Sequence, residues 1–302
     1  VYNAAAYKVA EGSVIEELVK KLPGAKIEED GTITINGKQV KKLLLDGREF
    51  MGGDLETGLK NLPADIVDKI KSYDEKSDLA KLTGIDDGEE VTVLDFGVKK
   101  EMKKGFNVNT NIGYGTHDRY AGRFMGARFY GDLRYTLLGN MNNTGGGGKR
   151  RSKMTGVNIN YEKRDKLKID GGIRWNHSDN NNWSKSAVES FVNTTGAFSN
   201  SENQNYSRSD GWNANMRLEW KPDTMTTITF RPSFNYSVND GRGFSSLASY
   251  KEDPYLYVDE PLDDEGIGVM EDNGLMVNRR RNKSLSNSDN WSTGASLQFF
   301  RK

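Results

Sequence analysis

The sequence contains no cysteine. Disulfide bridges, thiolate catalysis and cysteine-ligated zinc sites are therefore excluded within these residues. An excess of charge of one sign is also missing, because 43 Lys and Arg residues balance 43 Asp and Glu residues. Without a global positive field, the chain lacks the attraction by which general nucleic-acid binders capture phosphates. We therefore expect no nucleic-acid partner.

Long hydrophobic runs are absent as well. The mean hydropathy is −0.75, and no apolar run approaches the roughly 20 residues that a membrane-spanning helix needs. This excludes a helical membrane protein for these residues. A membrane β-barrel remains compatible with the composition, because only alternate residues of its strands face lipid and the hydropathy signal of each strand is weak.

Catalytic and metal-binding motifs are missing too. The two histidines, His117 and His177, have no Glu-x-x-His or paired-carboxylate spacing near them. No Gly-x-Ser-x-Gly elbow appears, and the glycines 145–148 before Lys149-Arg150-Arg151 lack the strand-to-helix context of a phosphate loop. Nothing supplies an activated nucleophile or an acid/base pair. We therefore expect no enzyme activity, no metal site and no cofactor.

What the sequence does contain is a strand pattern, which is clearest in Gly105–Thr116. One face of this run is apolar or hydroxylated, with Phe106, Val108, Thr110, Ile112 and Tyr114, and the other has Asn107, Asn109, Asn111, Gly113 and Gly115. In a soluble sheet the apolar face would meet a core. Here the alternation recurs to the C-terminus without a helical pattern that could cover it, so a membrane β-barrel is the leading interpretation.

About eight alternating runs can be recognised in total by this criterion. The seven after the first are approximately Tyr120–Phe129, Leu133–Met141, Thr155–Tyr161, Leu167–Asn176, Ala214–Trp220, Thr226–Tyr236 and Trp291–Phe299. Charged residues keep to one face, which we expect to point inward: Arg134, Arg174 and Arg217 are examples. Their neighbours Leu133 and Trp175 belong to the face that is expected to point outward.

The connections between these runs alternate in length. Those after every second run are short, namely Tyr130–Asp132, Lys163–Lys166 and Lys221–Thr224, and the intervening ones grow along the chain, namely Thr116–Arg119, Asn142–Lys153, Ser178–Gly211 and about Asp240–Ser286. Outer-membrane barrels have short periplasmic turns and long external loops. Aromatic residues just before the short connections, Phe129, Tyr161, Trp220 and Phe299, predict an interfacial girdle. The alternative, a soluble β-sandwich, predicts neither feature.

The first hundred residues have a different texture, a small α+β unit of short elements. Ser13–Glu16 has the spacing of a capping box, and Asp30–Gly31 predicts a tight turn between two short strands. Asp54 can cap a helix that runs to Asn61, and Leu62–Asp65 is expected to begin another. Carboxylates in the turns of this unit are interpreted as solvated charges.

An eight-stranded barrel encloses only enough space for its own side chains, so it cannot hold a unit of about a hundred residues. The pattern therefore predicts a larger barrel, 22-stranded by analogy with plugged transporters. On this interpretation residues 1–99 are a plug domain in the lumen and residues 100–302 are the N-terminal part of the wall. Both ends of the sequence look cut, since it starts at Val1 without Met and stops at Lys302 without a turn.

Several ordered segments of the first hundred residues carry a resemblance to a known family. They are Ser13–Gly24, Asp30–Lys38, Leu45–Phe50, Gly52–Asp54, Asn61–Ala64, Tyr73–Asp78 and Thr83–Gly88. They resemble the plug of TonB-dependent outer-membrane receptors, in the branch common in Bacteroidota. The resemblance implies a Gram-negative outer-membrane location and active transport of a nutrient, chelate, glycan or peptide. It also implies a TonB-type energy transducer as partner, although the segment that contacts this partner is absent here.

The candidate ligand-binding residues fall in two groups. Arg48, Glu49 and Asp54 lie in turns of the plug and are candidates for its ligand-facing tip; Trp183, Trp212, Tyr255 and Tyr257 are expected in outer loops, where they can stack on a ligand or pack over the pore. Further expected partners are outer-membrane lipid, lipopolysaccharide at the basic tip 149–151, and outer-membrane lipoproteins or other complex members. The alternative function is a structural barrel of an assembly or secretion complex without transport.

Overall fold

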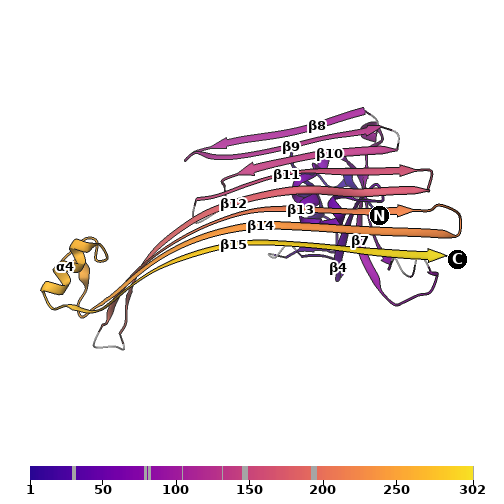
Figure 1. Ribbon diagram of the computed structural model, residues 1–302. Coiled ribbons are helices and arrows are strands. Elements are labelled where there is room, and N and C mark those ends of the chain that lie inside the picture. Colours follow the sequence, from indigo (N-terminus) through magenta and orange to yellow (C-terminus); the bar gives the residue numbers. More distant parts are fainter. Residues whose placement is uncertain are drawn as a thin grey trace.

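The computed structural model describes residues 1–28, 32–77, 80, 83–103, 105–130, 132–144, 149–191 and 196–301. They form two sheets (Figure 1). A seven-stranded sheet with short helices occupies the first hundred residues, and an eight-stranded sheet follows it. Within this described part of the chain, no helix has the length and apolar character needed to cross a membrane.

The N-terminal unit, residues 1–103, is built around the seven-stranded sheet. Its elements are β1 (Tyr2–Asn3), η1 (Ala4–Ala6), α1 (Ile15–Val19), β2 (Ala25–Ile27), β3 (Ile33–Ile35), β4 (Lys38–Leu45), β5 (Arg48–Glu49), η2 (Met51–Gly53), α2 (Leu55–Asn61), η3 (Ala64–Ile66), β6 (Val67–Lys76), β7 (Glu90–Val98) and η4 (Lys100–Lys103). The strand order is β1-β6-β7-β4-β3-β2, with β5 paired to β4. Strands β4 and β7 are parallel, and the other pairs are antiparallel.

Apolar side chains of this unit form one core with part of the second sheet. Ile15 and Leu18 of α1, Leu43 of β4 and Phe96 of β7 are fully buried. Met125, Ala127, Leu138 and Met154 of the eight-stranded sheet belong to the same cluster. The two sheets are therefore joined by a shared apolar contact as well as by the polar contacts described below.

Two local predictions for the unit are confirmed. Strands β2 and β3 pair as an antiparallel hairpin, although the turn predicted at Asp30–Gly31 lies outside the described residues. Asp54 caps α2, because its Oδ1 accepts a hydrogen bond from the Thr57 amide at 3.1 Å.

Two others are wrong. The helix after Ser13 starts one residue later than a capping box requires, with Val14 as an N-cap that forms no side-chain bond. The Ile15 amide donates instead to the Leu62 carbonyl at 2.9 Å, and Val14 bridges Pro63. The helix expected from Leu62 is a single turn, η3, because the chain enters strand β6 at Val67 and pairs along β7.

The eight-stranded sheet is antiparallel throughout. Its strands are β8 (Gly105–Gly115), β9 (Arg119–Tyr130), β10 (Leu133–Asn142), β11 (Lys149–Lys163), β12 (Leu167–Glu189), β13 (Phe198–Trp220), β14 (Thr226–Tyr250) and β15 (Met276–Arg301). They pair in chain order from β8 to β15. The N-terminal unit lies against one face, which we call the inner face, and the other is the outer face (Figure 1). The predicted inward positions of Arg134, Arg174 and Arg217 are confirmed, because all three contact the N-terminal unit, whereas Arg128 of β9 lies on the outer face opposite Phe106.

The predicted long loops Ser178–Gly211 and Asp240–Ser286 are wrong in large part. Strands β12 to β15 continue through most of them, and within these two predicted loops the connections between strands are reduced to residues 190–197 and 251–275. The prediction failed because the extended parts are rich in Ser and Asn on both faces, so the apolar alternation ends while backbone pairing continues. Figure 1 shows these strands curving away from the N-terminal unit.

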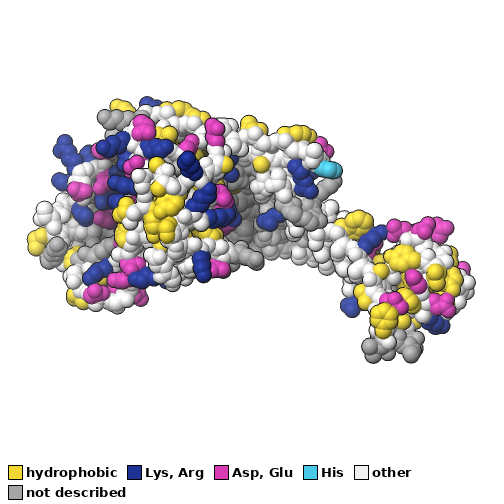
Figure 2. Space-filling model, turned by 180° about the vertical axis from the view of Figure 1, so that it is seen from behind, with side chains coloured by type: hydrophobic (Ala, Val, Ile, Leu, Met, Phe, Trp, Pro, Cys, Tyr) yellow, Lys and Arg dark blue, Asp and Glu magenta, His cyan; other side chains and the backbone are white. Residues whose placement is uncertain are grey.

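Residues 251–275, which we call the distal lobe, fold at the tips of the long strands. The lobe contains η5 (Pro254–Leu256) and α4 (Asp264–Asp272). Met270 packs with Ala248 and Tyr250 of β14 in a second small core. In Figure 2 the lobe carries hydrophobic and acidic side chains and is joined to the rest by a mostly uncharged, pale stretch.

Candidate functional site

Most hydrogen bonds and ion pairs that join the N-terminal unit to the inner face of the sheet involve residues 46–57. We call these residues the docking segment. It starts with the Asp46–Gly47 turn, in which both residues have positive φ, 53° and 74°. This is the backbone that a two-residue hairpin between β4 and β5 requires. The turn directs the following residues toward strands β10 to β13.

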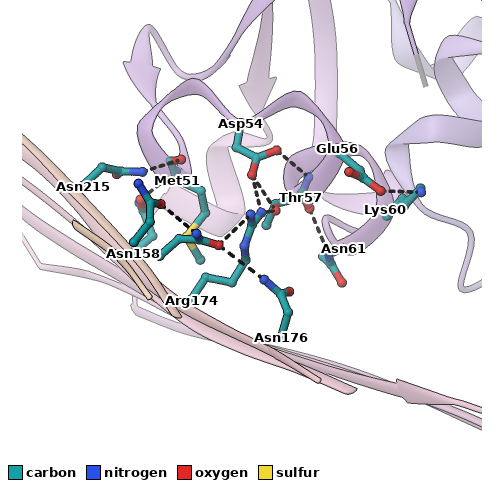
Figure 3. Close-up of polar contacts among 12 residues, drawn as sticks. Met51, Asp54, Glu56, Thr57, Lys60, Asn61, Asn158, Arg174, Asn176 and Asn215 are labelled. Atoms are coloured by element: carbon teal, nitrogen blue, oxygen red, sulfur yellow. Dashed lines mark hydrogen bonds and ion pairs between the residues drawn. The ribbon is translucent and has the colours of Figure 1, made fainter. Parts of the chain in front are cut away.

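Met51 of the docking segment contacts the sheet through both its backbone and its side chain (Figure 3). Its amide donates to Oδ1 of Asn158 at 2.9 Å, and Nδ2 of Asn215 donates to its carbonyl at 3.5 Å. The Met51 side chain lies over two glycines of the sheet. A Cβ added to Gly156 would lie 3.0 Å from Cε of Met51, and a Cβ added to Gly172 would lie 2.9 Å from Sδ of Met51. The eight-stranded sheet, which we call the wall below, is therefore shaped to receive this residue.

Gly52 continues the close approach. Its φ is 69°, and an added Cβ would lie 2.6 Å from the Asn215 side chain. Only glycine satisfies both the left-handed backbone and the lack of space. Gly52 thus has a physical reason, which is the short distance between the docking segment and β13, whereas Gly53 has a positive φ of 83° and lies beside Lys42.

Arg174 of β12 is a clamp on the start of α2 (Figure 3). Its Nη1 donates to the Asp54 carboxylate and to the Thr57 hydroxyl, while Nη2 donates to Asn213 at 3.3 Å. Asp54 also caps the helix through Thr57. One carboxylate therefore joins the helix start to the wall.

Arg48 and Glu49 form ion pairs with opposite charges of the wall. Nη2 of Arg48 lies 2.8 Å from Glu162, and Nη1 of Arg217 lies 2.9 Å from Glu49. Lys42 of the N-terminal unit approaches Glu49 at 2.8 Å. Burial raises the pKa of Glu49, but the charges of Lys42 and Arg217 outweigh burial and hold this pKa below its ordinary value.

The interface is polar and incompletely satisfied. Nη1 of Arg48, Nε of Arg174 and Oδ1 of Asn215 are buried without a hydrogen-bond partner among the described residues. Partly buried ion pairs contribute little net stability, because desolvation offsets their attraction. Such a surface fixes the orientation of the docking segment. It contributes less free energy to docking than an apolar interface of the same size would.

The seven predicted ligand residues fall at three places. Arg48, Glu49 and Asp54 all lie at this interface, already paired with the wall. Trp183 and Trp212 are in strands β12 and β13, so their predicted loop positions are wrong. Tyr255 and Tyr257 lie in the distal lobe as expected. Whether any of them contacts a ligand stays a prediction.

The partners on the wall were missed as site residues. They are Asn158, Glu162, Arg174, Asn215 and Arg217. The alternation pattern had placed all five on the inner face. A signal for them was available in the sequence. Charged and amide residues recur on that face at the same positions of neighbouring strands, and the N-terminal unit that faces them has charged turns.

The outer face carries two rows of aromatic residues. Across β12 to β15, the side chains of Trp175, Trp212, Tyr236 and Trp291 lie directly opposite one another in register. The Trp175 and Trp212 rings are 6.4 Å apart. Nearer the short turns lie Tyr161, Trp220 and Phe299. The fourth residue predicted for that row is wrong: Phe129 faces inward beside Arg134, and its neighbour Tyr130 is the exposed one.

Between the two rows the outer face is apolar. Its residues on β12 to β15 are Ile169, Gly171, Ile173, Ala214, Met216, Leu218, Ile228, Phe230, Pro232, Phe234, Thr293, Ala295 and Leu297. Trp220 follows Trp212 by eight residues, which is about 26 Å at about 3.3 Å per residue. With a strand tilt of about 40° the band is about 20 Å tall, comparable with the roughly 25 Å of outer-membrane barrels.

No group of three or more potential metal ligands occurs among the residues that the structure describes. His177 is held by Asp210, with Nδ1 2.7 Å from Oδ1. This pair lies on the outer face just beyond the aromatic row, and Arg208 approaches the same carboxylate at 3.1 Å. The arrangement is a small charge network at the edge of the apolar band.

Comparison with known proteins finds no matching family model and no matching curated protein. Among solved structures, the siderophore receptor PirA from Pseudomonas aeruginosa has a TM-score of 0.34 and 11% identity, over 99% of this chain and 55% of that chain. The alcaligin outer-membrane receptor FauA from Bordetella pertussis has 0.32 and 9%, over 95% and 49%. The FpvAI–pyocin S2 complex has 0.34 and 11%, over 95% and 50%. The structural neighbours are thus outer-membrane receptors at low identity, and the chain spans about half their length.

Proposed function

We propose that this chain is the plug and the first part of the wall of a large outer-membrane β-barrel that imports a ligand actively. Residues 1–99 are the plug domain and residues 100–302 the wall. One observation carries the proposal: the same sheet presents an apolar band between aromatic rows on the outer face of β12 to β15 and charged docking groups for a folded unit on the inner face of β10 to β13. A lipid bilayer and a water-filled lumen are the two environments that such faces match.

The polar character of the docking surface favours a transport function over a barrel whose lumen stays closed. Importers must displace part of the plug with energy from another membrane, and a TonB-type transducer is the partner that we propose. Ion pairs such as Arg48–Glu162 and Glu49–Arg217 fix the resting position of the plug, yet water can replace them when the segment moves. We propose that Arg48, Glu49 and Asp54 report ligand binding through this surface.

The ligand itself enters from the side of the long strands. Trp183, Tyr255 and Tyr257 are proposed contacts there, because all three are exposed beyond the outer aromatic row. Trp212 belongs to the aromatic row and is proposed as a membrane anchor in addition. A nutrient, chelate, glycan or peptide fits this scheme, which needs no cofactor and no catalytic group.

The second candidate function is a structural barrel in an outer-membrane assembly, with a lipoprotein or another complex member as partner. The distal lobe favours it, because Tyr255, Leu256 and Tyr257 expose large side chains at 53%, 75% and 44% at the end of the molecule farthest from the N-terminal unit. A stable partner would cover this patch.

Uptake measurements in cells distinguish the two functions. With the full-length protein, importer function requires that uptake of at least one ligand of these classes stops when the inner-membrane energy system is deleted. Arg174→Ala should change uptake, since it frees Asp54 and Thr57 from the wall, while Lys60→Ala, which removes only an exposed pair with Glu56, is the matched control. Unchanged uptake without the energy system, together with a stable co-purifying partner, contradicts the importer and supports the structural barrel.

A further inference from the structure

Beyond the docking segment, the inner face of strands β12 to β15 has a restricted composition. In five successive rows across the four strands, which begin at Asn176, Ser178, Asn180, Asn182 and Ser184 of β12, every inner residue is Asn, Ser or Gly. We call this surface the neutral field. Because 28% of the residues in the chain are charged, composition alone does not account for a surface of this size without a charged side chain.

The restriction applies to one face of these strands. On the outer face, the same stretch of β12 carries His177, Asp179, Asn181 and Trp183, and the equivalent positions of β14 include charged and aromatic residues. A segment that was merely restricted to small polar residues would show them on both faces, because alternate residues of a strand point to opposite sides. The neutral field is therefore a property of the surface that continues from the docking segment toward the distal lobe. In Figure 2 the stretch between the N-terminal unit and the lobe is correspondingly pale.

Hydrogen bonding divides the neutral field into two zones. In a row near the docking segment the side chains bond to one another across the strands: Oγ of Ser209 donates to Oδ1 of Asn239 at 2.7 Å, and Nδ2 of Asn239 donates to Oγ of Ser288 at 3.5 Å. Two rows farther out, the paired residues Asn182 and Asn205 have no side-chain hydrogen bond among the residues that the structure describes. Their amides are therefore open to a ligand.

Glycines keep the outer zone shallow. Gly243 lies between Asn205 and Ser284 of the neighbouring strands. A Cβ added to Gly243 would collide with Oγ of Ser284 and would lie 3.3 Å from Oδ1 of Asn205. Oγ of Ser286 occupies the equivalent space over Gly241. The polar side chains can thus lie along the sheet, and the field is a continuous surface of amides and hydroxyls.

The dimensions of the neutral field suit an extended ligand. Ser184 follows Asn176 by eight residues, which is about 26 Å at about 3.3 Å per residue, and four strands about 4.8 Å apart make the field about 14 Å wide. Its first row lies directly beyond Arg174, which binds the docking segment. A chain-like ligand could therefore lie along the field and reach the docking segment.

Three arginines of the inner face lie just outside the neutral field. Arg174 precedes it by one row and is engaged with Asp54. Arg150 of β11 lies opposite Asn180, and Arg280 of β15 lies one row beyond the distal end of the field. Over most of its length the field offers only dipoles, which compensate the lost hydration of a charged ligand poorly. Arg150 and Arg280 provide an internal test of whether the ligand is charged.

We infer that the neutral field binds an uncharged oligosaccharide on its way to the docking segment. Asn and Ser side chains both donate and accept hydrogen bonds, and so do the hydroxyl groups of a sugar. An apolar ligand finds no ring or aliphatic group in the field, and a charged chelate or peptide finds no counter-charge within it. The inference rests on the proposed import function and selects one of the ligand classes that this function leaves open.

The test measures binding of radiolabelled probes to the purified full-length protein in detergent by equilibrium dialysis. The neutral probes are maltohexaose, cellohexaose and mannohexaose, and the charged probes are hexagalacturonate and ferric citrate. We expect at least one neutral hexamer to bind more tightly than both charged probes. Asn182→Ala and Asn205→Ala should each weaken this binding about fivefold, as expected for the loss of one hydrogen bond between uncharged groups.

Asn181→Ala is the matched control, because Asn181 is adjacent to Asn182 but bonds to Gln204 on the outer face. It should leave the binding of the neutral hexamer unchanged. Equal binding by the wild type, Asn182→Ala and Asn205→Ala overturns the neutral field as the site, and so does the absence of binding by all three neutral hexamers.

Tighter binding of a charged probe, lost in the double variant Arg150→Gln/Arg280→Gln, overturns the uncharged ligand. Failure of the inference and failure of the proposed function have different signatures. Binding in detergent needs no energy source, whereas import in cells does. Neutral-hexamer binding together with energy-independent uptake contradicts the import proposal alone, and energy-dependent uptake without such binding contradicts the neutral field alone.

Discussion

At the scale of single residues, the docking segment shows how backbone conformation and close packing act together. The Asp46–Gly47 turn and the Met51–Gly53 turn both use positive φ angles, but a Cβ added at Gly47 would meet no atom, whereas one added at Gly52 would meet the eight-stranded sheet. Glycine at position 47 serves conformation alone. Glycine at position 52 serves conformation and space, because Asn215 fills the position that a side chain would take.

This difference gives a matched pair of substitutions. Gly47→Ala meets no atom within 4 Å and should cost only the left-handed penalty of about 1–2 kcal/mol. Gly52→Ala adds a 2.6 Å contact with Asn215 and should cost more, with the docking segment displaced. Hydrogen exchange of residues 46–57 in the purified full-length protein measures the effect. Equal exchange in the two variants would show that Gly52 does not approach the wall.

A second residue-scale prediction concerns Glu49, which belongs to the N-terminal unit and lies outside the wall strands. Its pKa in the docked state is below the ordinary value of 4.5 because of Lys42 and Arg217, despite burial. When docking lowers the pKa of a carboxyl, the carboxylate stabilises docking at pH values above its pKa in the undocked state. This stabilisation is lost as the pH falls through the pKa of the docked state. We expect the protection of residues 46–57 to decrease below about pH 4.

The measurement is hydrogen exchange from pH 3 to 7, corrected for intrinsic rates. Glu49→Gln should lower protection at pH 7 and flatten its dependence on pH, because the titrating group is gone. Glu56→Gln is the control, since within the described ranges Glu56 pairs only with Lys60, on an exposed helix face. A Glu49→Gln profile that still falls at low pH would assign the effect to another carboxyl.

At the scale of elements, the strands combine two different sequence patterns in one continuous ladder. Strand β13 alternates apolar and polar residues from Trp212 to Trp220, and before that it is polar on both faces. The first pattern matches a bilayer on one side, and the second matches water on both. Backbone hydrogen bonding continues unchanged across the boundary, which lies at the aromatic row.

The boundary predicts a depth-dependent cost for charge on the outer face. Met216→Arg, midway between Trp212 and Trp220, should destabilise the membrane-inserted protein by about 2–4 kcal/mol, whereas Val238→Arg, just beyond Tyr236, should cost about 0–1 kcal/mol. Unfolding of the full-length protein from lipid vesicles in denaturant measures both values. Equal costs for the two variants would mean that the apolar band does not face lipid.

At the scale of the whole molecule, the eight-stranded sheet is open. Among the residues that the structure describes, strands β8 and β15 each pair with one neighbour, so one edge of each strand carries unpaired backbone groups. Such edges are not stable in lipid. The proposed membrane location therefore requires partner strands at both edges, and the space that the N-terminal unit occupies is the reason why we propose a large barrel.

The open edges predict the behaviour of residues 1–302 expressed alone. This segment should not give a closed barrel whose electrophoretic mobility resists heating in detergent, because β8 and β15 cannot pair with each other while the N-terminal unit fills the inner face. Gel mobility with and without heating, together with mass measurement of the detergent complex, checks the expectation. A heat-resistant monomer with all strands paired would contradict the large barrel.

The sequence by itself determined which residues face each side of the sheet. Alternation of apolar and polar residues is a local property, so the outward set from Phe106 to Tyr114 and the inward set with Arg174 and Arg217 could be predicted without tertiary information. The short turns and the helix after Asp54 could be predicted for the same reason, since capping and turn formation depend on neighbouring residues.

Tertiary structure alone decided the rest. The extended strands beyond Trp175 and Trp212 are held by pairing with neighbours, which polar sequences permit but do not specify. The alignment of the aromatic row, the pairing of Arg174 with Asp54 and the space left for Met51 depend on register between distant strands. Register results from the sum of many weak cross-strand contacts, so no single segment of the sequence contains it.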